Sequence, residues 1–180
     1  MASQSVGTWN VDPSHAQVEF AAKHLMFSTV KGRFAVRAGT IVYDETNPAR
    51  SSVEVEIDTA SVSTGDDKRD GHLKSADFFD AENHPVATFR STRVDPIGAN
   101  GAQIQGDLTI RGRTVPVVLS ATLVGRGTSP WGTTVIGFSA ATTIKRSDWG
   151  LTWNVGLETG GVLVGDTIAL QIEAEAIKAS

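Results

Sequence analysis

Cysteine is absent from this chain of 180 residues, which excludes disulfide bonds and thiolate chemistry. An uninterrupted apolar run long enough to span a bilayer is also absent, so we expect no stable membrane insertion. The first residues, MASQSVGTWNVD, contain neither the basic segment nor the hydrophobic segment of a signal peptide. We therefore expect a soluble protein located in the cytoplasm.

An excess of charge of one sign is lacking as well. The net charge is −4, and the 16 basic and 20 acidic residues are scattered along the chain without a basic patch. Nucleic acid is therefore not an expected partner. Hydrophobic residues make up 40% of the sequence, enough for one folded domain over residues 1–180, in which we expect residues 1–7 to be disordered.

Motifs for metal binding and catalysis are missing too. The four histidines, at positions 15, 24, 72 and 84, share no recognised ligand spacing, so we expect no metal site. The sequence contains no nucleophile elbow, phosphate loop or paired-carboxylate motif. Ser14 and His15 are adjacent, and neighbouring side chains of a strand point to opposite faces, which argues against a nucleophile–base pair. We expect neither catalytic residues nor a cofactor.

What the sequence does contain is a repeated alternation of apolar and polar residues. The alternating segments are 15–24, 33–43, 52–62, 86–94, 102–111, 115–123, 133–145 and 166–177, preceded by a short segment at 8–12. About eight long strands at even spacing predict an all-β fold, either an antiparallel barrel or a sandwich. Eight strands make a barrel just wide enough to hold one small ligand.

The segment 69–80, RDGHLKSADFFD, breaks this alternation. Asp66 and Asp67 precede it, and carboxylates at that position cap a helix N-terminus and suit its dipole. We predict one short helix after the third long strand. A single helix inserted in a continuous antiparallel sheet is expected to plug or cover one end of it.

Several stretches resemble the YceI-like family of polyisoprenoid-binding proteins. They are DPSHAQVEFAAKHLMFSTVKGRF (12–34), VEIDTASVST (55–64), RDGHLKSADFFD (69–80), HPVATFRST (84–92), GDLTIRGRTVPVVL (106–119) and IGFSAATTIKRSDWGL (136–151). The resemblance implies an extended eight-stranded antiparallel lipocalin-like barrel, often in a dimeric protein. Its lumen would hold a long lipid such as a polyprenyl chain, an isoprenoid quinone or a fatty acid. Trp149 departs from the family pattern, in which phenylalanine is common.

We expect a long-chain lipid to contact the apolar face of the strands and the aromatic residues at their ends. The expected contacts are Val18, Phe20, Ala22, His24, Phe27, Phe34, Val36, Val55, Ile57, Phe78, Phe79, Phe89, Leu108, Ile110, Phe138, Trp149 and Trp153. Small residues on the same face should leave room for the ligand. They are Ala16, Ala22, Ala38, Ala121 and Ala140.

Some polar residues admit two interpretations. His24 shares the apolar face with Phe20, where it either bonds a lipid headgroup or quinone oxygen or is a core histidine satisfied by a neighbour. Arg69, Asp70 and His72 lie on the expected helix and either meet a headgroup or form a structural knot. In that knot Arg69 would pair with a carboxylate and His72 would bond a backbone carbonyl.

The irregular segment 146–161 also leaves alternatives. Trp149 and Trp153 either line the entrance to the lumen or anchor this loop. Arg146 either pairs with Asp148 and braces the loop or contacts a phosphate. In the leading interpretation this loop and the helix gate the mouth of the barrel.

Three functions are compatible with these patterns. The first is a carrier or store for a long apolar ligand, with Phe78 and Phe79 either contacting the tail or plugging one end. The second is an enzyme that acts on a lipid or quinone in the lumen with His24 or His72 as acid–base. The third is a structural domain whose lumen is filled by its own side chains.

Overall fold

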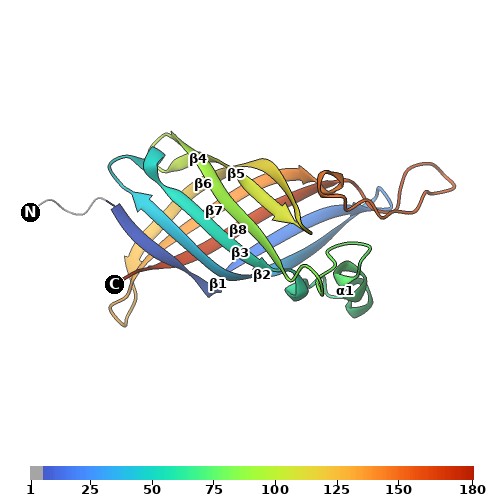
Figure 1. Ribbon diagram of the computed structural model, residues 1–180, viewed down its shortest axis with the longest axis horizontal. Helices are drawn as coiled ribbons and strands as arrows, with labels where there is room; N and C mark the ends of the chain where they lie inside the picture. The colour runs from blue at the N-terminus through green and yellow to red at the C-terminus, as the bar shows by residue number, and fades with distance from the viewer. Residues whose placement is uncertain (1–5) are drawn as a thin grey trace, which may run out of the picture.

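The computed structural model describes residues 6–180, in which eight antiparallel strands form a closed barrel (Figure 1). The strands are β1 (Val6–His24), β2 (Ser28–Asp44), β3 (Ser52–Asp58), β4 (Val86–Ile97), β5 (Gly101–Ile110), β6 (Arg113–Thr128), β7 (Thr134–Lys145) and β8 (Thr167–Lys178). Each strand pairs with its neighbour in sequence, and β8 pairs with β1. The expected eight-stranded barrel is confirmed. The disorder expected for residues 1–7 is wrong for Val6 and Gly7, which begin β1, and residues 1–5 lie outside the described part.

Two segments that were expected to be separate strands form one continuous strand. Residues 8–12 and 15–24 both belong to β1, and Pro13 and Ser14 form a bulge between them. The register with β8 shifts between Val11 and Ala16. Proline cannot donate to the strand ladder, so it is accommodated at such an irregularity.

A second bulge, in β2, changes which residues face the lumen. The register with β3 shifts between Val36 and Ala38, so that Ala38 is exposed and the expectation that it faces inward is wrong. Gly39 lies just after the shift, where a Cβ atom would come within 2.8 Å of Val11 Cγ2. The close approach of β1 and β2 therefore requires glycine at this position.

The turn between β5 and β6 is made by Arg111 and Gly112. Ile110 pairs with Arg113 across it, and the φ angles of Arg111 and Gly112 are 50° and 73°. A two-residue hairpin turn with positive φ at both central residues matches the right-handed twist of the flanking strands.

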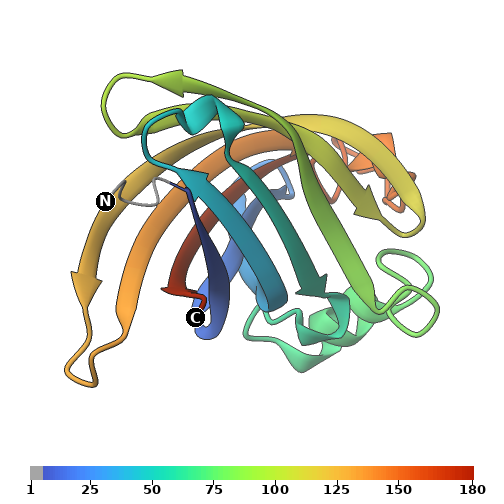
Figure 2. The same ribbon diagram turned by 60° about the vertical axis from the view of Figure 1, so that its left-hand side comes forward.

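Helix α1 (Asp67–Lys74) follows β3 as predicted, and Asp66 caps it by accepting a hydrogen bond of 2.9 Å from the Arg69 N–H. The helix lies at one end of the barrel, together with the β1–β2 turn and the loop between β7 and β8 (Figure 1). We call this the α1 end. The opposite end, the η1 end, carries the turn η1 (Pro48–Arg50), the β4–β5 turn and the β6–β7 loop (Figure 2).

Candidate ligand-binding cavity

The lumen contains an elongated cavity of about 220 Å³ that is lined by residues of all eight strands. It reaches the η1 end, where Pro48, Ser51 and the turn residues 98–100 line it. Residues 98–100 are exposed, so the cavity opens to solvent between η1 and the β4–β5 turn. The expectation that α1 and the Trp149 loop gate the mouth is therefore wrong, because the mouth is at the other end of the barrel.

The walls of the cavity come from the inward positions of the alternating strands. Seven of the expected contacts line it: Val18, Val36, Val55, Ile57, Phe89, Leu108 and Phe138. Alanines at positions 102, 121, 140 and 174 line it as well. Side chains of this size leave space in the lumen, so the hypothesis of a completely filled lumen is wrong.

Other lining residues were missed. Leu119, Leu123, Leu170 and Ile172 line the cavity and lie on the apolar faces that the alternation identified, so the same criterion would have found them. Ile41 and Tyr43 also line the cavity, but the alternation did not predict it. The β2 bulge shifts the alternation by one residue, so that positions 41 and 43 face inward. The turn residues at the mouth carry no periodic signal.

The lining of the cavity has no charged side chain in the described part of the chain. Its polar groups are hydroxyls and one amide, on residues such as Tyr43, Asn100 and Thr142. An unpaired charge in an apolar cavity would be strongly disfavoured. The interior is therefore suited to an uncharged apolar chain, and a charged group would have to stay at the mouth.

Three phenylalanines close the cavity toward the α1 end. Phe20 and Phe34 are the next inward-facing residues beyond Val18 and Val36 in that direction, with ring centroids 5.5 Å apart. Phe79 packs edge-on against Phe34 at 5.0 Å. We call Phe20, Phe34 and Phe79 the phenylalanine plug. These residues were expected to contact the ligand, and they are not part of the cavity lining because they fill the lumen.

Trp149 and Ile110 are also outside the lining. Trp149 is only 3% exposed, and its Nε1–H donates to the Leu108 carbonyl at 2.9 Å. It packs in one hydrophobic cluster with Ile110 and Phe89, next to the part of β6 that has no pairing with β7. The indole thus lies beside the cleft where β6 and β7 separate, outside the lining of the lumen cavity and away from its mouth at the η1 end.

Helix α1 is attached to the β7–β8 loop by an aromatic cluster. The His72 ring lies edge-on to Trp153 at 4.4 Å and to Phe78 at 5.1 Å, and His72 Nε2 is 2.8 Å from Asp77 Oδ2. Phe78 and Trp153 therefore do not line the cavity as expected. His72 thus bonds a carboxylate instead of the backbone carbonyl expected for it in a structural knot.

The residues around the start of α1 form a structural knot, but with different partners from those expected. Asp70 is buried and accepts from both the N–H and the Oγ1 of Thr64, at 2.8 and 2.6 Å. Arg69 donates from Nε to Thr64 Oγ1 at 2.7 Å, not to a carboxylate. Thr64 thus joins the two residues and fixes the chain that enters the helix.

Arg146 braces the β7–β8 loop, without Asp148. Its guanidinium donates to four main-chain carbonyls, those of Leu151, Trp153, Val164 and Gly165, at 2.6 to 3.1 Å. Arg146 is 6% exposed, and this burial lowers its pKa, against the opposing charge of Asp166. The predicted pair of Arg146 with Asp148 is wrong because the carbonyls use the donors that this pair would need.

The β1–β2 turn holds the remaining expected contacts away from the cavity. His24 and Ala22 are half-buried near this turn and are not part of the lining. Phe27 is 88% exposed, at the tip of the turn. Leu25 and Met26 have φ angles of 52° and 64°, and this left-handed backbone turns the chain sharply enough to direct Phe27 outward.

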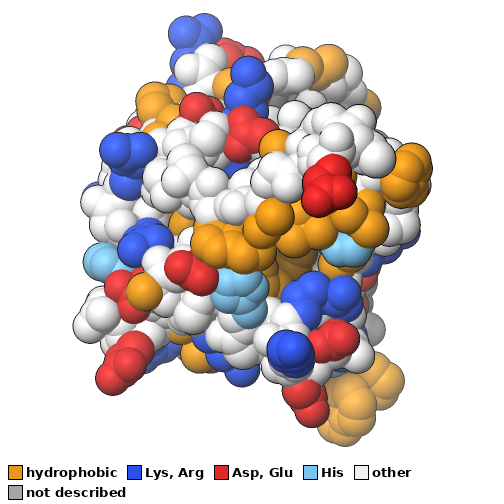
Figure 3. Space-filling view, turned by 90° about the vertical axis from the view of Figure 1, so that its right-hand side faces the viewer, with side chains coloured by type: hydrophobic (Ala, Val, Ile, Leu, Met, Phe, Trp, Pro, Cys, Tyr) orange, Lys and Arg blue, Asp and Glu red, His pale blue; other side chains and the backbone are white. Residues whose placement is uncertain are grey.

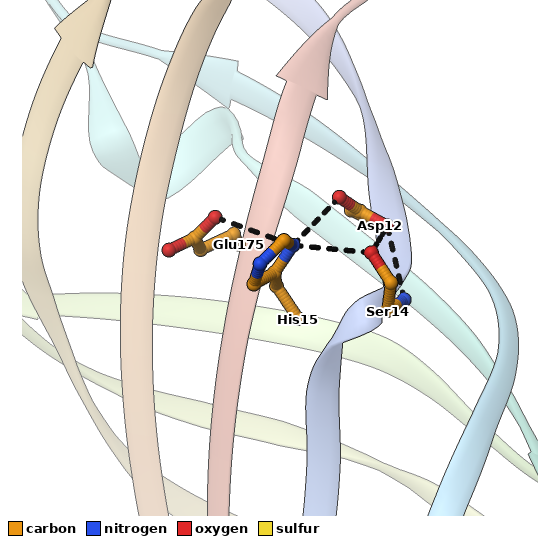
Figure 4. A network of polar contacts seen from close by, with 4 residues as sticks. All are labelled: Asp12, Ser14, His15 and Glu175. Atoms are coloured by element: carbon orange, nitrogen blue, oxygen red, sulfur yellow. Dashed lines mark hydrogen bonds and ion pairs between the residues drawn. The ribbon is translucent and has the colours of Figure 1, made fainter. Parts of the chain in front are cut away.

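A polar cluster on the outer wall brings Ser14 and His15 together (Figure 4). Because of the β1 bulge, Ser14 Oγ lies 3.1 Å from His15 Nδ1, so the expectation that the two side chains point apart is wrong. Ser14 Oγ donates to Asp12 Oδ1 at 2.6 Å, and His15 Nδ1 is also 3.0 Å from Asp12 Oδ2. A hydrolase triad needs separate ring nitrogens for the acid and the nucleophile, whereas one nitrogen meets both here.

The charges of this cluster stabilise one another. Hydrogen bonds from Ser14 and His15 lower the pKa of Asp12 to about 2. The hydrogen bond to Asp12, followed by the charge of Glu175, raises the pKa of His15. Both shifts favour the charged pair of Asp12 and His15, whose Oδ2 and Nδ1 atoms are 3.0 Å apart. The cluster is therefore an exposed structural network.

Residues 6–180 contain neither a cluster of metal-ligand side chains nor a membrane-spanning helix. No group of three or more His, Cys, Asp or Glu side chains there could hold a metal ion. No helix in that part of the chain is long and apolar enough to cross a bilayer.

Comparisons with known proteins agree with this architecture. A UPF0312 protein of Pseudomonas aeruginosa is 43% identical over 142 residues, which cover 79% of this chain and 74% of the relative. The crystal structure of the Campylobacter jejuni YCEI protein superimposes with a TM-score of 0.72 at 34% identity, covering 88% of this chain and 90% of that one. A polyisoprenoid binding domain from Saccharophagus degradans, implicated in plant cell wall breakdown, has the same fold, with a TM-score of 0.66 at 16% identity over 98% and 100% of the two chains.

The sequence profile of the YceI-like domain matches residues 9–176, from near the start of β1 to near the end of β8. This match covers nearly the whole described barrel, including the cavity and both of its ends. The chain therefore belongs to the YceI-like domain family.

Proposed function

We propose that this protein binds a long apolar ligand in the lumen and acts as its carrier or store. The ligand class is a polyisoprenoid, an isoprenoid quinone or a fatty-acid-like lipid. The observation that carries the proposal is the cavity itself, which is predominantly apolar, free of charged side chains and open at the η1 end. The Saccharophagus degradans domain that shares this fold is a polyisoprenoid binding domain, which supports the first of these classes.

Affinity would come from burial of the ligand chain. Each CH₂ group that leaves water contributes about 0.8 kcal/mol, so a tail of several carbons binds tightly with few polar contacts. The tail would lie among the alanines and branched residues of the lumen. Its polar group would lie at the mouth, near Asn100 and Ser51, where hydroxyl and amide groups line the opening.

An enzymatic role receives no comparable support. Neither His24 nor His72 lines the cavity, so neither lies where a bound lipid or quinone would be reached. His72 is instead engaged with Asp77.

A filled-lumen variant with a matched control tests the proposal. Ala140 lines the cavity, and Ala141, its neighbour on β7, is exposed on the outer face. Ala140→Phe should weaken binding of a fluorescent polyprenyl or fatty-acyl probe by at least tenfold, whereas Ala141→Phe should leave it unchanged. Equal binding by both variants would show that the probe binds elsewhere.

Mass spectrometry of lipids extracted from protein purified from its native host identifies the ligand. A single isoprenoid at near-stoichiometric yield would support a dedicated carrier, and a mixture of fatty acids would indicate a permissive store. An empty barrel, together with failure to bind any probe, would overturn the proposed function.

A further inference from the structure

The α1 end presents an apolar tip that the cavity does not use. Phe27 is 88% exposed and Met26 is 57% exposed in the β1–β2 turn. Val155 and Val162, which are 47% and 37% exposed, lie in the neighbouring β7–β8 loop. We call these four residues the apolar tip. Figure 3 shows hydrophobic side chains gathered in the middle of this end of the molecule.

Backbone contacts join the two loops of the tip into one unit. The Leu25 N–H donates to the Leu163 carbonyl at 2.9 Å, and the Leu163 N–H donates to the Val155 carbonyl at 2.9 Å. His24 also forms a bridge with Val164. The hydrophobic side chains are therefore presented from a braced support.

The conformation of the turn adds a second observation. Leu25 and Met26 both adopt positive φ, which is unfavourable for residues with large side chains. Strain of this kind persists where the surrounding structure enforces it, and it is concentrated at functional segments. Here the strained backbone holds large apolar side chains in water.

The charges beside the tip identify its partner. Residues 21–33, which form the hairpin that carries Met26 and Phe27, contain three basic residues and no acidic residue, although the whole chain has a net charge of −4. Lys23, Lys31 and Arg33 are all exposed on the outer face of this hairpin. Glu158 is the single acidic residue of residues 149–165, in the loop that completes the tip. Glu19 pairs with Arg33 on the outer face, and Asp66, Asp67 and Asp77 lie in or beside α1 at the same end, so the basic excess is confined to the β1–β2 hairpin that carries the tip. An apolar tip on a basic hairpin matches an anionic lipid surface.

We propose that the protein docks reversibly on anionic membrane surfaces through the apolar tip, with Phe27 and Met26 entering the interface and Lys23, Lys31 and Arg33 facing the headgroups. The docking is peripheral, because only side chains of two loops enter the bilayer. It does not depend on the lumen ligand, so an empty barrel would overturn the proposed function and leave this inference intact.

Vesicle co-sedimentation tests the proposal on the full chain. The vesicles are phosphatidylcholine alone and an equal mixture of phosphatidylcholine and phosphatidylglycerol. We expect binding to the mixed vesicles that falls as salt is raised, because exposed charges are screened. The double variant Met26→Ser with Phe27→Ser should bind at least roughly tenfold more weakly, since it removes the side chains whose burial drives insertion.

The opposite end provides a matched control. Trp131, in the β6–β7 loop of the η1 end, is 88% exposed, the same fraction as Phe27. Trp131→Ser should leave vesicle binding unchanged. Lys31→Gln with Arg33→Gln should weaken binding to mixed vesicles by roughly fivefold per residue. Thermal unfolding of each variant checks that the barrel is intact.

Three results would overturn the proposal. The first is that the wild-type protein fails to bind either kind of vesicle. The second is that Trp131→Ser abolishes binding while the Met26/Phe27 variant retains it, which would assign docking to the η1 end. The third is a dimer in sedimentation that the Met26/Phe27 variant converts to a monomer without any vesicle binding, which would assign the tip to a second copy of the chain.

Discussion

The two ends of the barrel share one strand pattern but differ in what occupies the lumen. Toward the η1 end, alanines at positions 102, 121, 140 and 174 face inward and the cavity is open. Toward the α1 end, the phenylalanine plug fills the same space, and α1 and the β7–β8 loop cover it. The comparison shows that alternation decides which residues face inward, whereas side-chain volume and irregular segments decide where a ligand fits.

The largest expected effect comes from removing the brace of the closed end. Arg146→Ala eliminates four hydrogen bonds to main-chain carbonyls, at about 1 kcal/mol each, so the free energy of unfolding should fall by about 4 kcal/mol. Urea unfolding measures this. Arg50→Ala at the η1 end is the control, because its side chain is 74% exposed and should contribute less than about 0.5 kcal/mol. A similar loss of unfolding free energy in both variants would show that the α1 end is not braced more strongly than the η1 end.

The next effect tests whether the plug sets the depth of the cavity. Phe79 is partly buried, so Phe79→Ala should lower the free energy of unfolding by about 2 kcal/mol, less than for a fully buried phenylalanine, and extend the lumen toward α1. Affinity for a series of fatty acids of increasing chain length should then rise for the longest members. If the longest chains bind Phe79→Ala no better than the wild type, the plug does not limit the cavity.

A smaller effect is expected in the wall beside the closed end. Trp149→Phe removes the Nε1–H that bonds the Leu108 carbonyl, which should cost about 1 kcal/mol of stability and leave ligand affinity unchanged. Trp131→Phe, at an exposed position, should change neither quantity. A change of ligand preference in Trp149→Phe would contradict this expectation and assign Trp149 a role in ligand entry.

The smallest effect concerns the outer wall between the two ends. The pKa of His15 is raised by Asp12 first and by Glu175 second, so Asp12→Asn should lower it more than Glu175→Gln, as followed by NMR titration of the imidazole. The stabilisation from protonated His15 is fully present below the ordinary pKa of 6.5 and is lost as pH rises through the raised value. Asp12 behaves oppositely, with stabilisation that is present above pH 3.8 and lost as pH falls through about 2. An unchanged His15 titration in Asp12→Asn would contradict the network of Figure 4.

The regular parts of the molecule were predictable from sequence, because their signals are local. Alternation identified the inward faces of the strands, and Asp66 indicated the start of α1 through its capping position. The family resemblance and the barrel were both confirmed. These features depend on residues two to four apart in the chain.

The remainder depends on contacts between distant residues. The β2 bulge places Ala38 outside, although its position in the alternation was inward. Trp149 was expected in the mouth, but its partner, Leu108, lies in a strand far from it in sequence. The location of the mouth depends on which turns come together at each end of the barrel, and the alternation of apolar and polar residues does not predict this.

One pairing in the barrel differs from all the others in its consequence for folding. Each other strand pairs with its neighbour in sequence, whereas β1 and β8 bring the two far parts of the chain together. The entropy cost of loop closure grows with the length of chain enclosed, so this seam is expected to form last. Until then the chain is an open sheet with two unpaired edges, which invite pairing with another copy. His15 and Glu175, 3.8 Å apart, attract each other across this seam, beside the bulge of β1.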